Sequence, residues 1–213
     1  MKFKDFLGMM KLGFILAVFA TASCIMLAFV YAGTKPLIDQ RQEVELVKAE
    51  NELFPDADSF EEIKNIESPD PAVTILLAHS ALKNGEVIGA VLELSRASYS
   101  GPIMTMVGVS TDGFITGVKI LEHSDTPGFG ANAASSSYFV DRENGITFYG
   151  QFAGKHISHS FRVKDDVIAI TASTITSNAV SSSVKAAGLA AHAWFTGEEV
   201  DVVFGTLEEG GEL

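Results

Sequence analysis

The stretch that decides the fold is residues 74–95, TILLAHSALKNGEVIGAVLELS. Two apolar runs flank the Asn-Gly pair at residues 84–85, and such a pair between apolar runs is the strongest short-range signal for a β-hairpin. A second hairpin signal follows in residues 101–121, GPIMTMVGVSTDGFITGVKIL, where an Asp-Gly pair at residues 112–113 separates two further runs. Together they predict an antiparallel sheet within residues 72–123.

Downstream of this sheet, the pattern changes from strands to loop and then to helix. Residues 128–144 predict a loop with a short helix, and residues 157–163 and 167–170 are candidate strands. From Thr176 onward, apolar residues recur at the spacing of one helix face: Val180, Val184, Ala187, Ala191 and Trp194. A last strand is expected over residues 200–204.

Upstream of the sheet lies a membrane-spanning candidate, residues 12–32, LGFILAVFATASCIMLAFVYA, which are 21 residues without a charge. At ~1.5 Å rise per residue, a helix of this length crosses the ~30 Å hydrocarbon core of a bilayer. A cleavable signal peptide usually has a shorter apolar core of roughly 7–15 residues. A lipoprotein site at Cys24 would lack the usual preceding aliphatic residue. The stretch therefore predicts one retained transmembrane helix in contact with membrane lipid.

Charge predicts the orientation of this helix. The net charge of the chain is −12, and residues 1–11 carry +2, which leaves −14 on the other side of the span. By the positive-inside rule the N-terminus is cytoplasmic and the remainder is periplasmic or extracellular. A strongly acidic exterior domain argues against nucleic acid as a partner. Because the single cysteine, Cys24, lies inside the span, an intrachain disulfide is excluded.

The chain thus divides into four parts. A cytoplasmic tail (1–11) and the transmembrane helix (12–32) precede a stalk helix and loop (33–71), and residues 72–213 form the exterior domain. The stalk helix should start at Pro36, a residue suited to the first helical position, and end near Leu53 with its apolar residues resting on the domain. Residues 54–71 predict a loop. The fold class is α+β, an antiparallel sheet with packed helices on one N-terminal transmembrane helix.

Common catalytic motifs are absent from the sequence, which contains no phosphate-binding Walker loop, no strand-following GxGxxG and no GxSxG elbow. No catalytic residue is predicted. His156 and His159 could be considered as a metal pair, but a strand would place them on opposite faces and no third ligand is apparent. No metal site is predicted.

Residues 167–180, VIAITASTITSNAV, combine a short apolar run with a helix start rich in hydroxyl groups. Ser173 or Thr174 could cap this helix by accepting from backbone N–H groups of its first turn. The same free N–H groups make a helix N-terminus a phosphate site, and small residues let a ligand approach. Spacing alone leaves both interpretations open.

Residues 170–184, ITASTITSNAVSSSV, resemble the flavinylation motif of the FMN-binding domain family, Ser/Thr-Gly-Ala-Thr followed by hydroxyl-rich residues and a helix. Ala172 stands where the motif has Gly, and Ser173 where it has Ala. Residues 98–130 resemble the family's other signature, which ends in His-x-Glu-Thr-Pro-Gly-Leu-Gly, here HSDTPGFG. Residues 149–155, YGQFAGK, are similar to the Gln-Phe-x-Gly-Lys piece that follows.

Together with the transmembrane helix, the resemblance covers about residues 11–195 and is closest to the G subunit of the Rnf electron-transport complex. The C subunit of the sodium-translocating NADH:quinone oxidoreductase is the near alternative. The resemblance implies an electron-carrying subunit, not catalytic alone, in a membrane machine that couples ferredoxin and NAD chemistry to ion pumping. The other Rnf subunits would be its partners, and a separate flavin transferase would attach the cofactor.

The resemblance also implies a cofactor site. FMN would be joined to Thr174 by a phosphodiester, with further contacts from a set of polar residues and glycines: Thr171, Ser173, Thr176, Asp125, Thr126, Gly128, Gly130 and Lys155. From turn chemistry alone, residues 126–128 predict a type II turn. Two other functions stay open: a membrane-anchored binding or sensor module without a cofactor, and a flavin-dependent reductase domain with noncovalent FMN.

Overall fold

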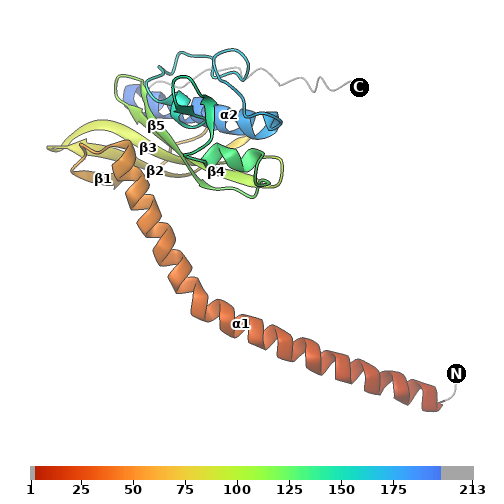
Figure 1. Ribbon diagram of the computed structural model, residues 1–213. Helices are drawn as coiled ribbons and strands as arrows, with labels where there is room; N and C mark the ends of the chain where they lie inside the picture. Colours follow the sequence, from red (N-terminus) through yellow and green to blue (C-terminus); the bar gives the residue numbers. More distant parts are fainter. Residues whose placement is uncertain (1–2, 198–213) are drawn as a thin grey trace. The chain divides into compact units, whose positions relative to one another are not determined.

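The computed structural model describes residues 3–197 and contains two compact units, with the boundary between Leu46 and Val47. Helix α1 (Phe3–Leu53) makes up the described part of the first unit and continues into the second (Figure 1). It is long and apolar enough to cross a membrane, and its large apolar side chains between Met10 and Ile38 are exposed. A helix that exposes apolar side chains on every face suits lipid rather than water.

The stalk does not begin a new helix at Pro36. Pro36 lies inside α1, which runs without a break from the apolar stretch to Leu53. A proline removes one backbone N–H from the helical ladder, yet the helix continues through Pro36 to Leu53. A proline by itself is therefore a weak sign of a new helix start.

The second unit is built on a five-stranded sheet (Figure 1). Its strands are β1 (Ser59–Glu62), β2 (Val73–Lys83), β3 (Glu86–Ala97), β4 (Pro102–Ser110) and β5 (Ile115–Glu122). They pair in chain order, and every pair is antiparallel. Both predicted hairpins are present. Asn84 and Gly85 have φ of +53° and +81°, the positive values that a two-residue hairpin turn favours.

Helix α2 (Thr174–Thr196) covers one face of this sheet and contacts mainly β3 and β4. It begins two residues before the predicted start at Thr176. Four residues of the predicted stripe are buried against the sheet: Val180, Val184, Ala187 and Ala191. The core also holds Leu92, Leu94 and Val107 from the strands. The α+β class predicted from the sequence is confirmed.

The remaining segments depart from the sequence-based expectation. Residues 59–62, expected in a loop, form edge strand β1 because they pair with the exposed side of β2. Between β5 and α2 lie the 3-10 helices η1 (Gly130–Ala134) and η2 (Gly150–Phe152), and the short strands β6 (Phe139–Asp141) and β7 (Ile146–Thr147). The strand expected over residues 200–204 lies outside the described residues.

The two strands expected over residues 157–163 and 167–170 are not formed, so that prediction is wrong. Phe161 has a φ of +52°, which breaks an extended run. Its N–H and that of Arg162 donate to the Asp166 carboxylate at 2.9 and 2.8 Å. Lys185 Nζ of α2 donates to two carbonyls of the same loop. Side chains thus satisfy the backbone groups that strand partners would otherwise have paired.

The end of α1 packs on the sheet face opposite α2, in a groove made by three glycines. Cβ atoms added to Gly89, Gly108 and Gly117 would meet the side chains of Leu53 or Phe54. Both of these side chains are buried, as is Glu50, which contacts His79 of β2. Among the predicted stalk contacts within the second unit, that of Leu53 is present, whereas Val47 is exposed.

We expect Gly108→Ala to destabilise the domain by about 2 kcal/mol, because overpacking a filled site costs about 1–3 kcal/mol. The new methyl would overlap the Thr116 hydroxyl, which must turn away, and would lie 3.1 Å from Leu53 Cβ and 3.1 Å from Phe54 Cε2. Denaturant unfolding of the full-length protein in detergent measures the effect. If the cause is contact with the helix end, the cost of Gly108→Ala must be smaller in a Phe54→Ala background, which removes the ring that the methyl would meet. An equal cost in both backgrounds would contradict this explanation.

Candidate functional site

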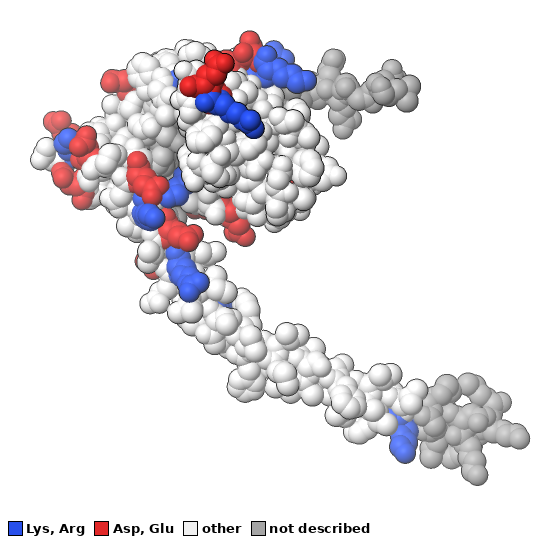
Figure 2. Space-filling model, viewed as in Figure 1, with Lys and Arg blue, Asp and Glu red and all other residues white. Residues whose placement is uncertain are grey.

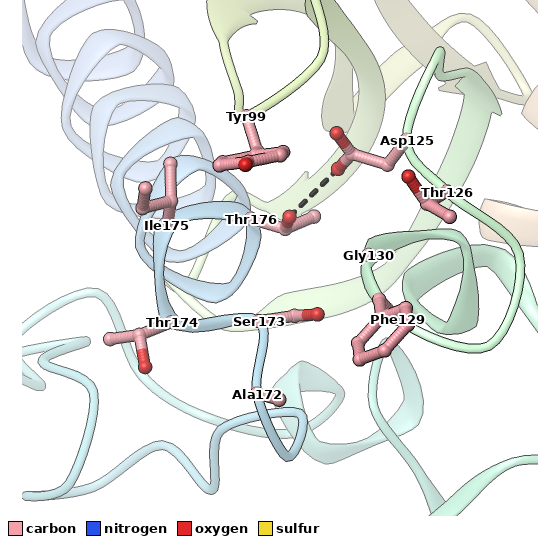
Figure 3. A pocket seen from close by; sticks show the side chains of 10 residues that line it. All are labelled: Tyr99, Asp125, Thr126, Phe129, Gly130, Ala172, Ser173, Thr174, Ile175 and Thr176. Carbon is pink, nitrogen blue, oxygen red and sulfur yellow. Dashed lines mark hydrogen bonds between the residues drawn. The ribbon is translucent and has the colours of Figure 1, made fainter.

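A cavity of about 550 Å³ opens where α2 begins, beside η1 and the loop between β3 and β4 (Figure 3). Residues from three separate parts of the chain line it: Tyr99, Asp125, Thr126, Phe129, Gly130, Ala172, Ser173, Thr174, Ile175 and Thr176. Tyr99 and Phe129 lie on opposite sides of it. The cavity is large enough for a small cofactor.

The Asp125 carboxylate forms hydrogen bonds with the other two of these parts of the chain. Its carboxylate is 6% exposed and accepts from the hydroxyls of Thr176 at 2.7 Å and Ser98 at 2.9 Å, and from the backbone N–H of Ser100 at 3.0 Å. Gly130 lies against this group, because a Cβ there would meet both the Asp125 carboxylate and the Thr176 hydroxyl. One carboxylate thereby joins the β3–β4 loop, the segment after β5 and the first turn of α2.

The same contacts hold Asp125 ionised. Burial by itself would raise the pKa of Asp125, but the hydrogen bonds from Thr176 and from the Ser100 N–H lower it. The Ser98 hydroxyl and the nearby His123 lower the pKa further. The net direction is below the usual value, because each donor stabilises the charged form. The cavity therefore contains one fixed negative charge.

The start of α2 has no side-chain cap. Ser173 lies at the N-cap position, yet its hydroxyl makes no capping hydrogen bond, so the capping interpretation that spacing left open is not observed. Ser177 organises the turn instead: its hydroxyl accepts from the Ile170 N–H at 3.0 Å and donates to the Ser173 carbonyl at 2.9 Å. The first N–H groups of the helix thus stay available to a ligand, as in phosphate sites at helix N-termini.

Ser173 and Thr174 differ in accessibility. Ser173 is buried and in Figure 3 points toward Phe129, whereas Thr174 is exposed and turns outward at the edge of the cavity. Of these two hydroxyls, that of Thr174 can be reached from outside the molecule.

Ala172 has a φ of +58°, in the left-handed region. An L-residue with a Cβ pays roughly 1–2 kcal/mol for this conformation, and glycine pays almost nothing. The glycine of the flavinylation motif falls at this position, so the motif reflects a requirement of the backbone, which this chain meets with some strain.

We expect Ala172→Gly to stabilise the domain by about 0.5–1 kcal/mol, since relief of strain exceeds the entropy that glycine adds to the unfolded chain. Ala153 is the matched control, because it is exposed and has an ordinary φ of −59°. Ala153→Gly should destabilise the domain by a comparable amount. Denaturant titrations measure whether each variant raises or lowers the free energy of unfolding. A loss of stability in Ala172→Gly would contradict the assignment of strain.

The predicted turn at residues 126–128 is present. The Phe129 N–H donates to the Thr126 carbonyl at 3.1 Å, and Gly128 has a φ of +83°. Proline before a residue with positive φ is the pattern of a type II turn. The turn brings Thr126 and Phe129 to the wall of the cavity.

Comparison with known proteins shows the family to which the chain belongs. Residues 98–188 match the model of the FMN-binding domain, and residues 1–53 match that of the RnfG N-terminal region. The G subunit of the Na⁺-translocating ferredoxin:NAD⁺ oxidoreductase complex of Acetobacterium woodii is 30% identical over 200 residues, which cover 84% of this chain and 90% of that protein. The chain belongs to the Rnf G-subunit family.

Another member of the family is similarly related. The G subunit of the proton-translocating ferredoxin:NAD⁺ oxidoreductase complex of Clostridium ljungdahlii is 32% identical. The alignment covers 78% of this chain and 82% of that protein. The crystal structure of Shewanella oneidensis NqrC aligns over 67% of both chains with a TM-score of 0.41 and 17% identity.

The structure gathers most of the residues that the sequence assigned to the cofactor in this member of the Rnf G-subunit family. Asp125, Thr126, Gly130, Ser173, Thr174 and Thr176 line the cavity. Three assigned residues do not line it. Thr171 is exposed, and its N–H donates to the Tyr138 hydroxyl at 3.4 Å. Gly128 accepts from Asn132 Nδ2 at 3.0 Å. Lys155 Nζ donates to the Asp166 carbonyl.

Sequence reasoning missed three large apolar lining residues, Tyr99, Phe129 and Ile175. All are exposed despite their size, at 75%, 51% and 55%. Each lies next to a motif residue in the sequence, and this proximity was the only sign that it could line the cavity. The histidines do not meet in a metal site. His156 contacts Ser158 and His159 lies 3.6 Å from Asp166, and residues 3–197 contain no cluster of three or more potential ligands.

Proposed function

We propose that this chain is the electron-carrying G subunit of an ion-translocating oxidoreductase complex and holds FMN in the cavity at the start of α2. FMN would be joined to Thr174 Oγ1 through a phosphodiester. The observation that carries the proposal is the coincidence of an exposed threonine hydroxyl, an uncapped helix start and a cavity of about 550 Å³ within the region that matches the FMN-binding domain.

The cavity suits a phosphate at one end and a flat ring at the other. No lysine or arginine lines it among the described residues, so the N–H groups and dipole of α2 would supply the positive potential for the phosphate. Tyr99, Phe129 and Ile175 provide apolar surface on which an aromatic ring can rest. FMN supplies one- and two-electron transfer when bound, and the protein sets its position and electrostatic surroundings.

A covalent link fits a domain outside the cytoplasm. A dissociated cofactor would be lost there, whereas a tethered one stays with the protein whatever its intrinsic affinity. Thr174 Oγ1 would attack the FMN phosphorus of FAD, the bond to AMP would break, and AMP would leave. A threonine hydroxyl is a weak nucleophile, and a base of the separate flavin transferase would take its proton.

The remaining assignments concern placement and partners. The first eleven residues have a charge of +2, which supports a cytoplasmic N-terminus and an FMN domain on the periplasmic or extracellular side. Residues 12–32 would lie in membrane lipid. The partners would be the other subunits of the complex, as relatives are named as the G subunits of such complexes. We also propose Thr171, Gly128 and Lys155 as cofactor contacts, although these residues do not line the cavity.

In-gel fluorescence after denaturation in SDS tests the proposal. Full-length protein made with a flavin transferase and FAD should show a fluorescent band at its own mass. A known substrate of the same transferase serves as the positive control. A dark band beside a fluorescent control would refute covalent attachment, and flavin released on denaturation would favour noncovalent FMN instead.

A further inference from the structure

An uncharged surface surrounds the mouth of the cavity. Three stretches of the sequence contain no Lys, Arg, Asp, Glu or His, namely residues 97–111, 126–140 and 167–184. Each is bounded by a charged residue at both ends, and all three contribute to the cavity wall. In a chain with 20% charged residues, the 48 residues of these stretches would ordinarily hold roughly ten charges.

Burial explains part of this absence. Strand β4 and the inward face of α2 belong to the core, where charges are rare. Burial does not explain why charges are also absent from three largely exposed segments. These are the loop at residues 98–101, the segment 126–140 and the turn 171–175. We call these three segments the uncharged face. Figure 2 shows the side of the domain at η1 and the start of α2 without charged side chains, while charges gather elsewhere on the same unit.

The uncharged face also exposes large apolar side chains. Tyr99, Phe129, Ile175 and Phe139 are each at least 41% exposed. Small hydroxyl and alanine side chains surround them, including the exposed Ser136. Loss of charge together with enrichment in Tyr and Phe is typical of the centre of a protein–protein interface, whereas the Ser and Ala content of the uncharged face is higher than such centres usually have.

From this composition and from the position of the cavity we propose that the uncharged face is the docking surface for another protein subunit of the same complex, one that presents an uncharged apolar surface beside its own redox group. This inference rests on the proposed function. A redox partner must approach the cavity, since electron transfer fails over long distances, and whatever approaches the cavity covers the uncharged face. Relatives named as complex subunits show that such partners exist for them.

Two other occupants fit less well. A bilayer surface attracts lysine and arginine through its anionic lipids, and the uncharged face has neither. The cofactor itself is too small to cover all three segments, because the cavity accounts for Tyr99, Phe129 and Ile175 but Phe139 and Ser136 lie outside its lining.

Cysteine accessibility in the assembled complex tests the inference. In a Cys24→Ser background, Ser136→Cys places a thiol on the uncharged face, and Thr111→Cys places one in the exposed turn at the other end of β4. A charged, membrane-impermeant maleimide is applied to the complex and to the full-length subunit reconstituted alone in vesicles. Because interface centres exclude water, Ser136→Cys should react at least about tenfold more slowly in the complex than alone, and Thr111→Cys equally in both.

Two results would overturn the docking surface. Equal reaction of Ser136→Cys in both samples means that no subunit covers the face. Slow reaction already in the subunit alone means that lipid or a second copy covers it. In-gel flavin fluorescence of the same samples separates this inference from the proposed function: fluorescence without protection rejects the docking surface alone, and protection without fluorescence rejects the covalent flavin alone.

Discussion

Thr174→Ala should abolish the covalent flavin completely, while the domain keeps its fold. Thr174 is exposed at the first position of α2, outside the buried core. Alanine is the best helix former, so its cost at this position is small. In-gel fluorescence after coexpression with a flavin transferase should fall to background, with a thermal unfolding midpoint within a few degrees of the wild type measured without cofactor.

Neighbouring hydroxyls provide matched controls for this experiment. Thr171→Ala removes another exposed hydroxyl, one that does not line the cavity, and it should keep a fluorescent band. Ser173→Ala removes a buried one that makes no capping hydrogen bond and restores the alanine of the family motif, and it should also keep the band. If Thr174→Ala stays fluorescent and Thr171→Ala becomes dark, the tether is Thr171 and the family register has been misapplied.

Local signals in the sequence predict most of the fold. The Asn-Gly and Asp-Gly pairs place two hairpins correctly because Asn84, Gly85 and Gly113 adopt positive φ, which is a local preference of these residue types. The α2 stripe is equally local, since periodic apolar residues identify one helix face. The errors concern segments whose structure depends on distant partners. Residues 157–170 have the apolar content of strands, but Asp166 and Lys185 satisfy their backbone in turns.

The cofactor site is predicted less completely than the fold. The motifs identify the polar residues and glycines that line the cavity, because these have recognisable roles in turns and helix starts. They do not identify Tyr99 or Ile175, since an apolar residue beside a motif looks like any core residue until its exposure is known. Nor does sequence show that Asp125 joins Ser98 and Thr176, which are 78 residues apart along the chain.

Asp125→Asn should lower the stability of the domain by about 2 kcal/mol at neutral pH, because hydrogen bonds to a charged acceptor contribute about 1.5–3 kcal/mol each and an amide keeps part of them. Asparagine has nearly the same shape, but its NH₂ group would face one of three donors, the Ser98 hydroxyl, the Thr176 hydroxyl or the Ser100 N–H. Asp112→Asn, in the exposed β4–β5 turn, changes the same charge and should have almost no effect.

The pH dependence separates loss of the carboxylate from a general packing defect. The pKa of Asp125 is lower in the folded protein than the ordinary value of 3.8, so its contribution to stability is fully present above that value. It disappears as the pH falls through the lower folded pKa, because the unfolded state then binds the proton first. The stability difference between wild type and Asp125→Asn should therefore be constant above about pH 5 and shrink below about pH 4.

Asp125→Glu completes this argument, since the family signature has glutamate at the equivalent position. It keeps the charge and should recover more than half of the stability that Asp125→Asn loses, with the same decline in acid. A difference between wild type and Asp125→Asn that persists unchanged to pH 3 would mean that the carboxylate charge contributes nothing. The junction of the three segments would then depend on the shape of the side chain at position 125, with the hydrogen bonds of Ser98 and Thr176 as secondary contacts.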